Sequence, residues 1–196
     1  ALLHGAYHHY TTVKSLGKIF KAEKSHSLRL TPLSAARLND RNECDKYANA
    51  EDARRTFIAC FNHENSESAN LWWLYAQGDP ESVRITFPRK EFVKWSERLL
   101  EEGAYVTDIV YAAVNGANDL YPQRRQNVLA WEDQRIRIDN LGPMLHRVKA
   151  GRLKDYEWRS EAETRIVKTG SGASKYEFVE IPAKLISSLR ITTSPW

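Results

Sequence analysis

Apolar and polar residues alternate in several short stretches of this chain, and each such stretch predicts a β-strand. Side chains at every second position of a strand lie on one face, so alternation is typical of a strand with one buried face. The run SVRITF at 82–87 alternates most cleanly, and TFIACF at 56–61 is a compact apolar strand. The expected strands are residues 6–12, 27–31, 56–61, 82–87, 104–114, 162–168, 176–181 and 189–193. A Gly/Ser turn at 170–173 predicts that its two flanking strands pair as a hairpin.

Apolar residues three or four positions apart mark the expected helices. Pro88 suits the first turn of a helix whose apolar stripe includes Phe92, Trp95 and Leu99, and Gly103 ends it. The other expected helices are residues 13–20, a short one around 71–75, and a mostly helical, basic stretch from 122 to about 152. Strands and helices that do not strictly alternate predict an α+β fold, with a mixed, mainly antiparallel sheet and flanking helices. The 196 residues are expected to form a single domain, residues 1–196.

The composition is that of a folded protein, with 42% hydrophobic, 28% charged and 11% aromatic residues. No stretch approaches the roughly 18 apolar residues of a membrane-spanning helix, and the first residues lack the basic start and apolar core of a signal peptide. We therefore expect no membrane partner and a cytoplasmic location, while secretion as an effector stays open. Cys44 and Cys60 are the only cysteines, and without CxxC spacing they argue against a zinc site or disulfide framework.

The chain is basic, with a formal net charge of +4 and a sequence pI of about 9.0. The positive side chains cluster at residues 124, 125, 135 and 137, and again at 147, 149, 152 and 154. Such clusters indicate an anionic partner, either a nucleic acid or a phosphate-bearing small molecule. The alternative is an ordinary solvated basic face.

The segment Glu161-x-Glu163-x-Arg165 contains the most informative charged residues. In a strand, these three side chains would lie on one face, as a row of two carboxylates and a guanidinium. Neighbouring carboxylates repel each other, so such a row forms either an exposed salt-bridge ladder or a site for acid–base or hydroxyl-binding chemistry. From spacing alone, the exposed ladder is the commoner arrangement.

Three other groups could contribute to a site. His8 and His9 are neighbours in a strand and therefore point apart, so a hydrogen-bonding role is expected and a metal site is not. The aromatic residues around Trp73 and Tyr75 either fill the core or line a pocket for a base or nicotinamide. The last group, Asn39, Asp40 and Glu43, could be a polar site or plain turn residues. Cys60 next to His63 could be a nucleophile, although burial in a strand is the commoner state of a cysteine.

Read in order, five short motifs resemble the family called domain of unknown function 2971. They are His9-Tyr10-Thr11, Asn39-Asp40-x-x-Glu43, Cys60-Phe61-Asn62, Trp73-x-Tyr75, and Lys154-x-x-x-Trp158-x-x-Glu161-x-Glu163-x-Arg165. The likeness spans nearly the whole chain. More remotely, a His on the first strand and a late strand with Glu-x-Glu are similar to ADP-ribosyltransferases, which implies an ADP-ribosyltransferase-like fold and NAD as substrate.

That resemblance implies a role for each matched residue. Glu163 would be the catalytic carboxylate that stabilises an oxocarbenium-like transition state, and Glu161 would assist the acceptor. His9 and Tyr10 would bind NAD, with Trp73 or Tyr75 stacked on the nicotinamide. The remaining residues are Lys154 and Arg165, which would contact phosphate or orient the glutamates, and Asn39, Asp40, Glu43 and Trp158 as further site residues. The implied protein is a toxin or phage-defence effector that modifies a nucleic acid or protein acceptor.

Two alternatives stay open. The chain could be a non-catalytic nucleic-acid-binding module, in which the basic region from Arg124 to Lys154 contacts phosphates and aromatic residues stack on bases. It could also be an interaction protein in which the Glu–Arg row is only structural. The sequence does not predict the oligomeric state or the acceptor.

Overall fold

The structure is a computed structural model that describes residues 5–21, 26–34, 50–64, 68–76, 79–112 and 153–195. Several sequence predictions lie outside these ranges. They concern the basic helical stretch from 122 to 152, the end of the expected strand at 113–114, and the polar group Asn39, Asp40 and Glu43.

Within the described residues, nine strands form one sheet in which every pairing is antiparallel. They are β1 (Ala6–Thr12), β2 (Phe20–Lys21), β3 (Ser27–Pro32), β4 (Thr56–Asn62), β5 (Ser82–Pro88), β6 (Ala104–Asp108), β9 (Glu163–Thr169), β10 (Glu177–Glu180) and β11 (Arg190–Thr193). The strands β7 (Val110–Ala112) and β8 (Leu153–Asp155) form a separate parallel pair.

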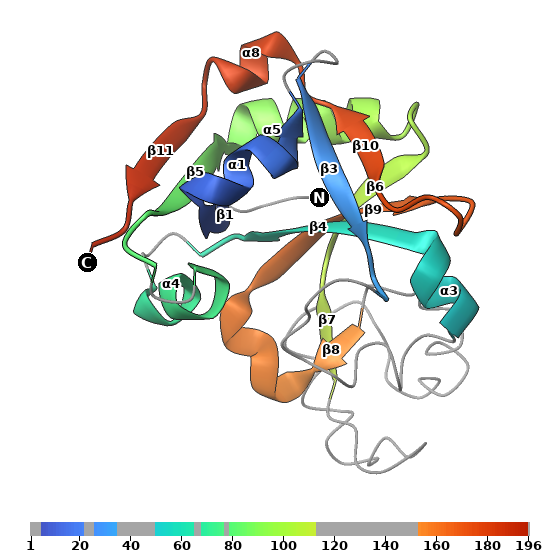
Figure 1. Cartoon of the computed structure of the whole chain (residues 1–196), viewed down its shortest axis with the longest axis horizontal. Helices are drawn as coiled ribbons and strands as arrows, with labels where there is room; N and C mark the ends of the chain where they lie inside the picture. The colour runs from blue at the N-terminus through green and yellow to red at the C-terminus, as the bar shows by residue number, and fades with distance from the viewer. Residues whose placement is uncertain are drawn as a thin grey trace.

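The described helices lie around this sheet (Figure 1). They are α1 (Val13–Ile19), α3 (Ala50–Arg55), α4 (Ala69–Ala76), α5 (Arg89–Leu99), α8 (Ala183–Ile186) and the 3-10 helix η2 (Tyr156–Glu161). The predicted α+β fold with a mainly antiparallel sheet is therefore confirmed. None of the described helices is long and apolar enough to cross a membrane.

The sheet divides at β4. One edge of this strand pairs with β9 along its whole length, from Thr56 to Asn62. The other edge pairs with β3 at residues 57 and 58 but with β1 at residue 62. One branch continues through β3 to β10 and the other through β1 and β5 to β11, so β10 and β11 lie on opposite sides of the molecule (Figure 1).

The main core lies between the sheet and α5. Phe92, Trp95 and Leu99 are fully buried, and their spacing places them on one side of the helix, as the apolar stripe predicts. The ring of Phe92 stacks on Tyr7 of β1 at 4.0 Å and meets Phe61 of β4 edge-on at 5.2 Å. In a second hydrophobic cluster, Trp72 of α4 packs edge-to-face against Tyr10 of β1.

The predicted hairpin between the last long strands is wrong. β9 pairs with β4 on one edge and β6 on the other, so it has no free edge for β10, which instead pairs with β3. A Gly/Ser turn indicates that the chain reverses direction, but it does not decide which strand the returning segment meets.

Two strand boundaries also differ from the prediction. The expected strand 104–114 is interrupted at Ile109, whose N–H donates to the carbonyl of Glu163 at 2.9 Å. The expected strand 162–168 begins one residue later, because Ala162 has a left-handed backbone with φ of 41°. Trp158 and Glu161 therefore lie in η2, and Glu161 is not part of the strand that contains Glu163.

Candidate functional site

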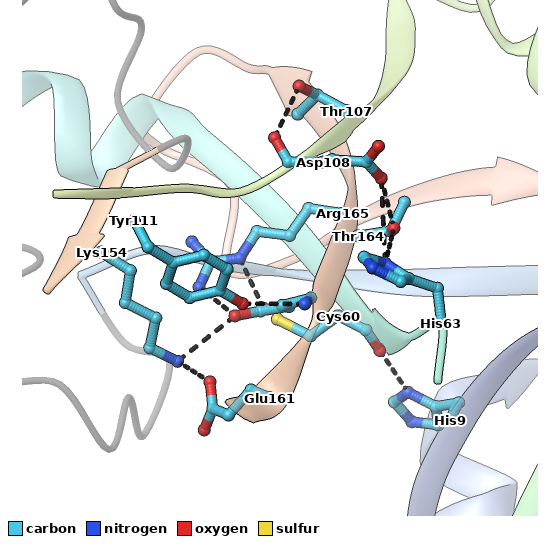
Figure 2. Close-up of polar contacts among 11 residues, drawn as sticks. His9, Cys60, His63, Thr107, Asp108, Tyr111, Lys154, Glu161, Thr164 and Arg165 are labelled. Atoms are coloured by element: carbon cyan, nitrogen blue, oxygen red, sulfur yellow. Dashed lines mark hydrogen bonds and ion pairs between the residues drawn. The ribbon is translucent and has the colours of Figure 1, made fainter. Parts of the chain in front are cut away.

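Four charged side chains meet in a buried cluster, which we call the carboxylate cluster: Lys154, Glu161, Glu163 and Arg165 (Figure 2). None is more than 2% exposed. The ammonium of Lys154 contacts Oε2 of Glu161 and lies 3.2 Å from Oε2 of Glu163. Arg165 donates from Nε to Oε1 of Glu163 at 2.6 Å and from a terminal nitrogen to Oε2 at 3.0 Å. The prediction that these charges form an exposed salt-bridge ladder is therefore wrong.

Three elements bring these side chains together. β9 presents Glu163 and Arg165 on one face, η2 ends at Glu161, and β8 contributes Lys154. The left-handed turn at Ala162 lets Glu161 approach the strand from its end. Asn62 of β4 holds this turn by donating from its side-chain amide to the carbonyl of Glu161 at 2.5 Å.

Tyr111 supports the same segment from β7. Its hydroxyl accepts a hydrogen bond from the backbone N–H of Glu163 at 2.8 Å, and Figure 2 shows its ring beside the carboxylate cluster. His63 donates its backbone N–H to the carbonyl of Ala162 at 3.0 Å. The backbone between Glu161 and Glu163 is thus hydrogen-bonded from two sides, which orients both carboxylates.

Glu163 and Lys154 are both charged at neutral pH. Burial by itself raises the pKa of Glu163, but Arg165 and Lys154 outweigh burial and lower this pKa from 4.5 to about 2. Burial by itself lowers the pKa of Lys154, but Glu163 and Glu161 outweigh it and raise this pKa above its ordinary value. The opposite charges hold one another in the ionised state.

The two carboxylates differ in their free hydrogen-bonding capacity. Both oxygens of Glu163 are engaged, by Arg165 and Lys154. Oε1 of Glu161, in contrast, is buried and has no hydrogen-bond partner among the residues that the structure describes. A buried polar atom without a partner is costly, and functional sites are where such atoms are retained. Glu161 therefore offers one acceptor to a ligand.

Cys60 and Tyr75 add neutral groups beside these charges. Cys60 is paired with Arg165 in the β4–β9 register, and its thiol donates a hydrogen bond to Glu163. Burial, followed by the negative charge of Glu163, raises the pKa of the Cys60 thiol well above its ordinary value. Burial, followed by Glu163 and Glu161, likewise raises the pKa of Tyr75. Both groups are protonated at neutral pH, so they can act as donors.

His9 lies on the opposite face of the sheet from this cluster. His8 pairs with Asn62, and Asn62 pairs with Glu163, so His8 shares the face of Glu163 and its neighbour His9 faces the other way. Nδ1 of His9 hydrogen-bonds to the backbone carbonyl of Cys60 at 2.8 Å (Figure 2). Burial lowers the pKa of His9, so its ring is neutral. His9 joins β1 to β4 where the sheet divides.

The other residues expected in the site take several positions. Tyr75 lies near the carboxylate cluster, and the ring of Trp158 is 5.3 Å from the ammonium of Lys154. Trp73 is 67% exposed, whereas its neighbour Trp72 is fully buried against Tyr10. The structure thus brings Lys154, Trp158, Glu161, Glu163, Arg165 and Tyr75 together and leaves His9 and Trp73 apart from them.

The structure adds roles that sequence analysis did not predict. Asn62, named above only as part of the Cys60-Phe61-Asn62 motif, and Tyr111 fix the backbone of the site, and their local sequence does not indicate this role. On the opposite face, Thr164 donates its hydroxyl to Asp108 at 2.6 Å and accepts from Nδ1 of His63 at 2.8 Å. The position of Thr164, between Glu163 and Arg165 in an alternating strand, does predict that it faces the other way.

Among the described residues, no three or more His, Cys, Asp or Glu side chains are close enough to hold a metal ion. The chain matches no protein family, no curated protein and no solved structure. The resemblance to the domain of unknown function 2971 family and to ADP-ribosyltransferases stays a prediction.

Proposed function

We propose that this protein cleaves the bond between nicotinamide and ribose in NAD and transfers the ADP-ribosyl group to a macromolecular acceptor. The observation that carries the proposal is the different pairing of the two carboxylate oxygens of Glu161. Lys154 holds one of its oxygens, while the other is buried without a hydrogen-bond partner in the described structure. A fixed, buried carboxylate with a free oxygen suits a reaction in which positive charge develops on a sugar.

The chemistry follows from that charge. As the glycosidic bond breaks, its electron pair leaves with nicotinamide, and the ribose carbon becomes oxocarbenium-like. The free oxygen of Glu161 would stabilise this positive charge or accept a hydrogen bond from a ribose hydroxyl. The acceptor then attacks the ribose carbon, and its proton is released to solvent. Because burial strengthens electrostatic interactions, the effect is larger here than it would be in water.

The roles of the two glutamates are exchanged relative to the sequence interpretation. Glu163 was expected to be the catalytic carboxylate, but Arg165 and Lys154 engage both of its oxygens. We assign Glu163 a positioning role, since it holds Lys154 next to Glu161. The catalytic role falls to Glu161.

Tyr75 and Cys60 complete the proposed site as neutral donors. Their raised pKa values keep both groups protonated beside the carboxylates. A protonated phenol can donate to a ribose hydroxyl, and its ring can stack on nicotinamide, as the resemblance implies for Tyr75. This arrangement supports binding of a neutral, hydroxyl-rich sugar next to an aromatic leaving group.

Nicotinamide release from NAD tests the proposal. The full chain is incubated with labelled NAD, with and without DNA, RNA or cell lysate, and both free nicotinamide and label transfer are measured. Wild type should release nicotinamide, and Glu161→Gln should reduce the rate about a hundredfold or more, as expected for loss of one electrostatic stabiliser. Glu157→Gln, an exposed substitution in the same 3-10 helix, is the matched control and should retain the wild-type rate.

The reactions with and without an added acceptor distinguish ADP-ribosyl transfer from NAD hydrolysis and from nucleic-acid binding. Nicotinamide release without label transfer would make the protein an NAD glycohydrolase, in which water is the acceptor. Absence of release from wild type in every arm would rule out NAD cleavage. Salt-sensitive binding of DNA or RNA without any release would favour the nucleic-acid-binding module, whose basic residues Arg124 and Arg125 lie outside the described residues.

A further inference from the structure

Two buried donors without acceptors lie side by side on β1 and β5. Tyr10 is directly opposite Arg84 in the antiparallel β1–β5 pair. Tyr10 is 5% exposed, and neither its hydroxyl nor Nε of Arg84 has a hydrogen-bond partner in the part of the chain that the structure describes. Thr192 of β11 pairs with Arg84 from the other side, which extends the polar row across three strands.

This row lies on the same face of the sheet as the carboxylate cluster. His8 is two residues before Tyr10 on β1, so the two side chains share a face. His8 pairs with Asn62, and Asn62 pairs with Glu163, so all three lie on this face as well. A hydrogen bond supports the assignment, because Nδ1 of His8 lies 3.0 Å from Oγ1 of Thr86, its cross-strand partner on β5.

Helix α4 connects the two groups. It packs on β1 and β5, where Trp72 meets Tyr10 edge-to-face with ring centroids 5.0 Å apart. Three residues further along, Tyr75 packs against the same cluster and interacts with Glu163 and Glu161. Glu163 and Arg84 are three strand spacings apart, β9 to β4 to β1 to β5, or about 14 Å at about 4.8 Å per strand.

We infer that Arg84 and Tyr10 bind the diphosphate group of the substrate. Both are donors, Arg84 carries a positive charge, and a diphosphate supplies several negatively charged acceptors in the fork geometry that a guanidinium matches. A dinucleotide with its nicotinamide ribose at Glu161 would carry its diphosphate one sugar away, on the same face of the sheet as Arg84. The inference deepens the proposed function and rests on it for the identity of the ligand as a dinucleotide.

The chemistry also explains why the row is retained. A buried donor without an acceptor destabilises the protein, and both the Tyr10 hydroxyl and Nε of Arg84 are such donors, although Arg84 as a whole is only half-buried. A group that completes its hydrogen bonds only when ligand binds carries this cost in the free protein. Replacing Arg84 should therefore weaken binding without lowering the stability of the free chain.

Titration of the full chain with ADP and with inorganic pyrophosphate tests the inference. Wild type should bind both, and Arg84→Gln and Tyr10→Phe should each bind ADP about tenfold or more weakly, the effect of losing a hydrogen bond to a charged group. Arg98→Gln removes the same charge from an exposed position on α5 and should bind like wild type. Glu161→Gln should also retain ADP affinity, because ADP lacks the ribose whose bond to nicotinamide is broken in the reaction.

Kinetics and stability separate a binding role from a structural one. Arg84→Gln should raise KM for NAD in nicotinamide release with little change in kcat, Arg84→Lys should restore part of the affinity, and the melting temperature should not fall. If Arg84→Gln does not fold, Arg84→Lys and Tyr10→Phe provide the same comparison. Unchanged ADP affinity in these variants, or no binding of ADP and pyrophosphate by wild type, would overturn the inference.

The outcomes distinguish this inference from the proposed function. Arg84-dependent binding of ADP without nicotinamide release would keep the diphosphate site and reject NAD cleavage. Release that does not depend on Arg84 would keep NAD cleavage and reject the diphosphate site. Arg84-dependent binding of a single-stranded oligonucleotide, with no binding of ADP, would assign the site to nucleic-acid phosphates and overturn the inference.

Discussion

Arg165 donates a 2.6 Å hydrogen bond from Nε to Oε1 of Glu163, two residues earlier on β9, and neither side chain is more than 2% exposed. An ion pair buried this deeply contributes little to stability compared with apolar side chains of similar volume. Lys154 and Glu161 complete the set, so that two positive and two negative groups face one another. This arrangement is easier to explain by chemistry at the site than by stability of the fold.

Replacement of Lys154 is expected to destabilise the protein strongly. Among the described residues, Lys154→Met removes the ion-pair partner of Glu161 and leaves Arg165 as the one cation paired with Glu163, in a buried environment. Breaking a buried pair in this way costs about 3–5 kcal/mol of unfolding free energy. Urea denaturation measures the change, with Lys90→Met on the exposed side of α5 as control. A loss below about 1 kcal/mol, the range of surface pairs, would contradict the buried cluster.

Acid should destabilise the protein through Glu163. The folded-state pKa of Glu163 is about 2, below its ordinary value of 4.5, because Arg165 and Lys154 outweigh the effect of burial. A lowered pKa stabilises the folded state above pH 4.5, and this contribution disappears as the pH falls from about 4.5 toward 2. It amounts to roughly 3 kcal/mol. Denaturation curves of wild type and Glu163→Gln between pH 7 and 2 measure it, and equal slopes in that window would refute it.

His9 is expected to affect stability and not NAD turnover. His9→Phe keeps an aromatic ring next to Phe61 but removes the hydrogen bond from Nδ1 to the carbonyl of Cys60. The unpaired carbonyl should lower the unfolding free energy by about 1–3 kcal/mol. Nicotinamide release at a temperature where the variant is folded should match wild type. A raised KM for NAD would instead place His9 in the substrate site, as the family resemblance implies.

The thiol of Cys60 should react slowly in the folded protein. Burial and the charge of Glu163 raise its pKa well above the ordinary value, and the thiolate is the reactive form. In a Cys44→Ser background, alkylation by iodoacetamide at pH 8 should be at least about tenfold slower in buffer than in urea. Equal rates under the two conditions would show that Cys60 is neither buried nor held protonated.

Much of the fold follows from local patterns in the sequence. The alternating run at 82–87 and the apolar run at 56–61 are strands β5 and β4, and the stripe of Phe92, Trp95 and Leu99 is the buried side of α5. These elements were predictable because side-chain periodicity depends only on neighbouring residues. The hairpin prediction failed because strand pairing depends on which edges are free, and β4 and β6 occupy both edges of β9.

For the site, too, local sequence and tertiary structure determined different features. The sequence by itself determined that Glu163 and Arg165 share a face of a strand and that Thr164 opposes them, since alternation is a property of the backbone. Only the tertiary structure decided that these charges are buried, that Lys154 lies between the two carboxylates, and that His9 faces away from them. Burial and long-range pairing depend on how the sheet divides at β4 and how the chain returns through Ala162, and neither is encoded in local spacing.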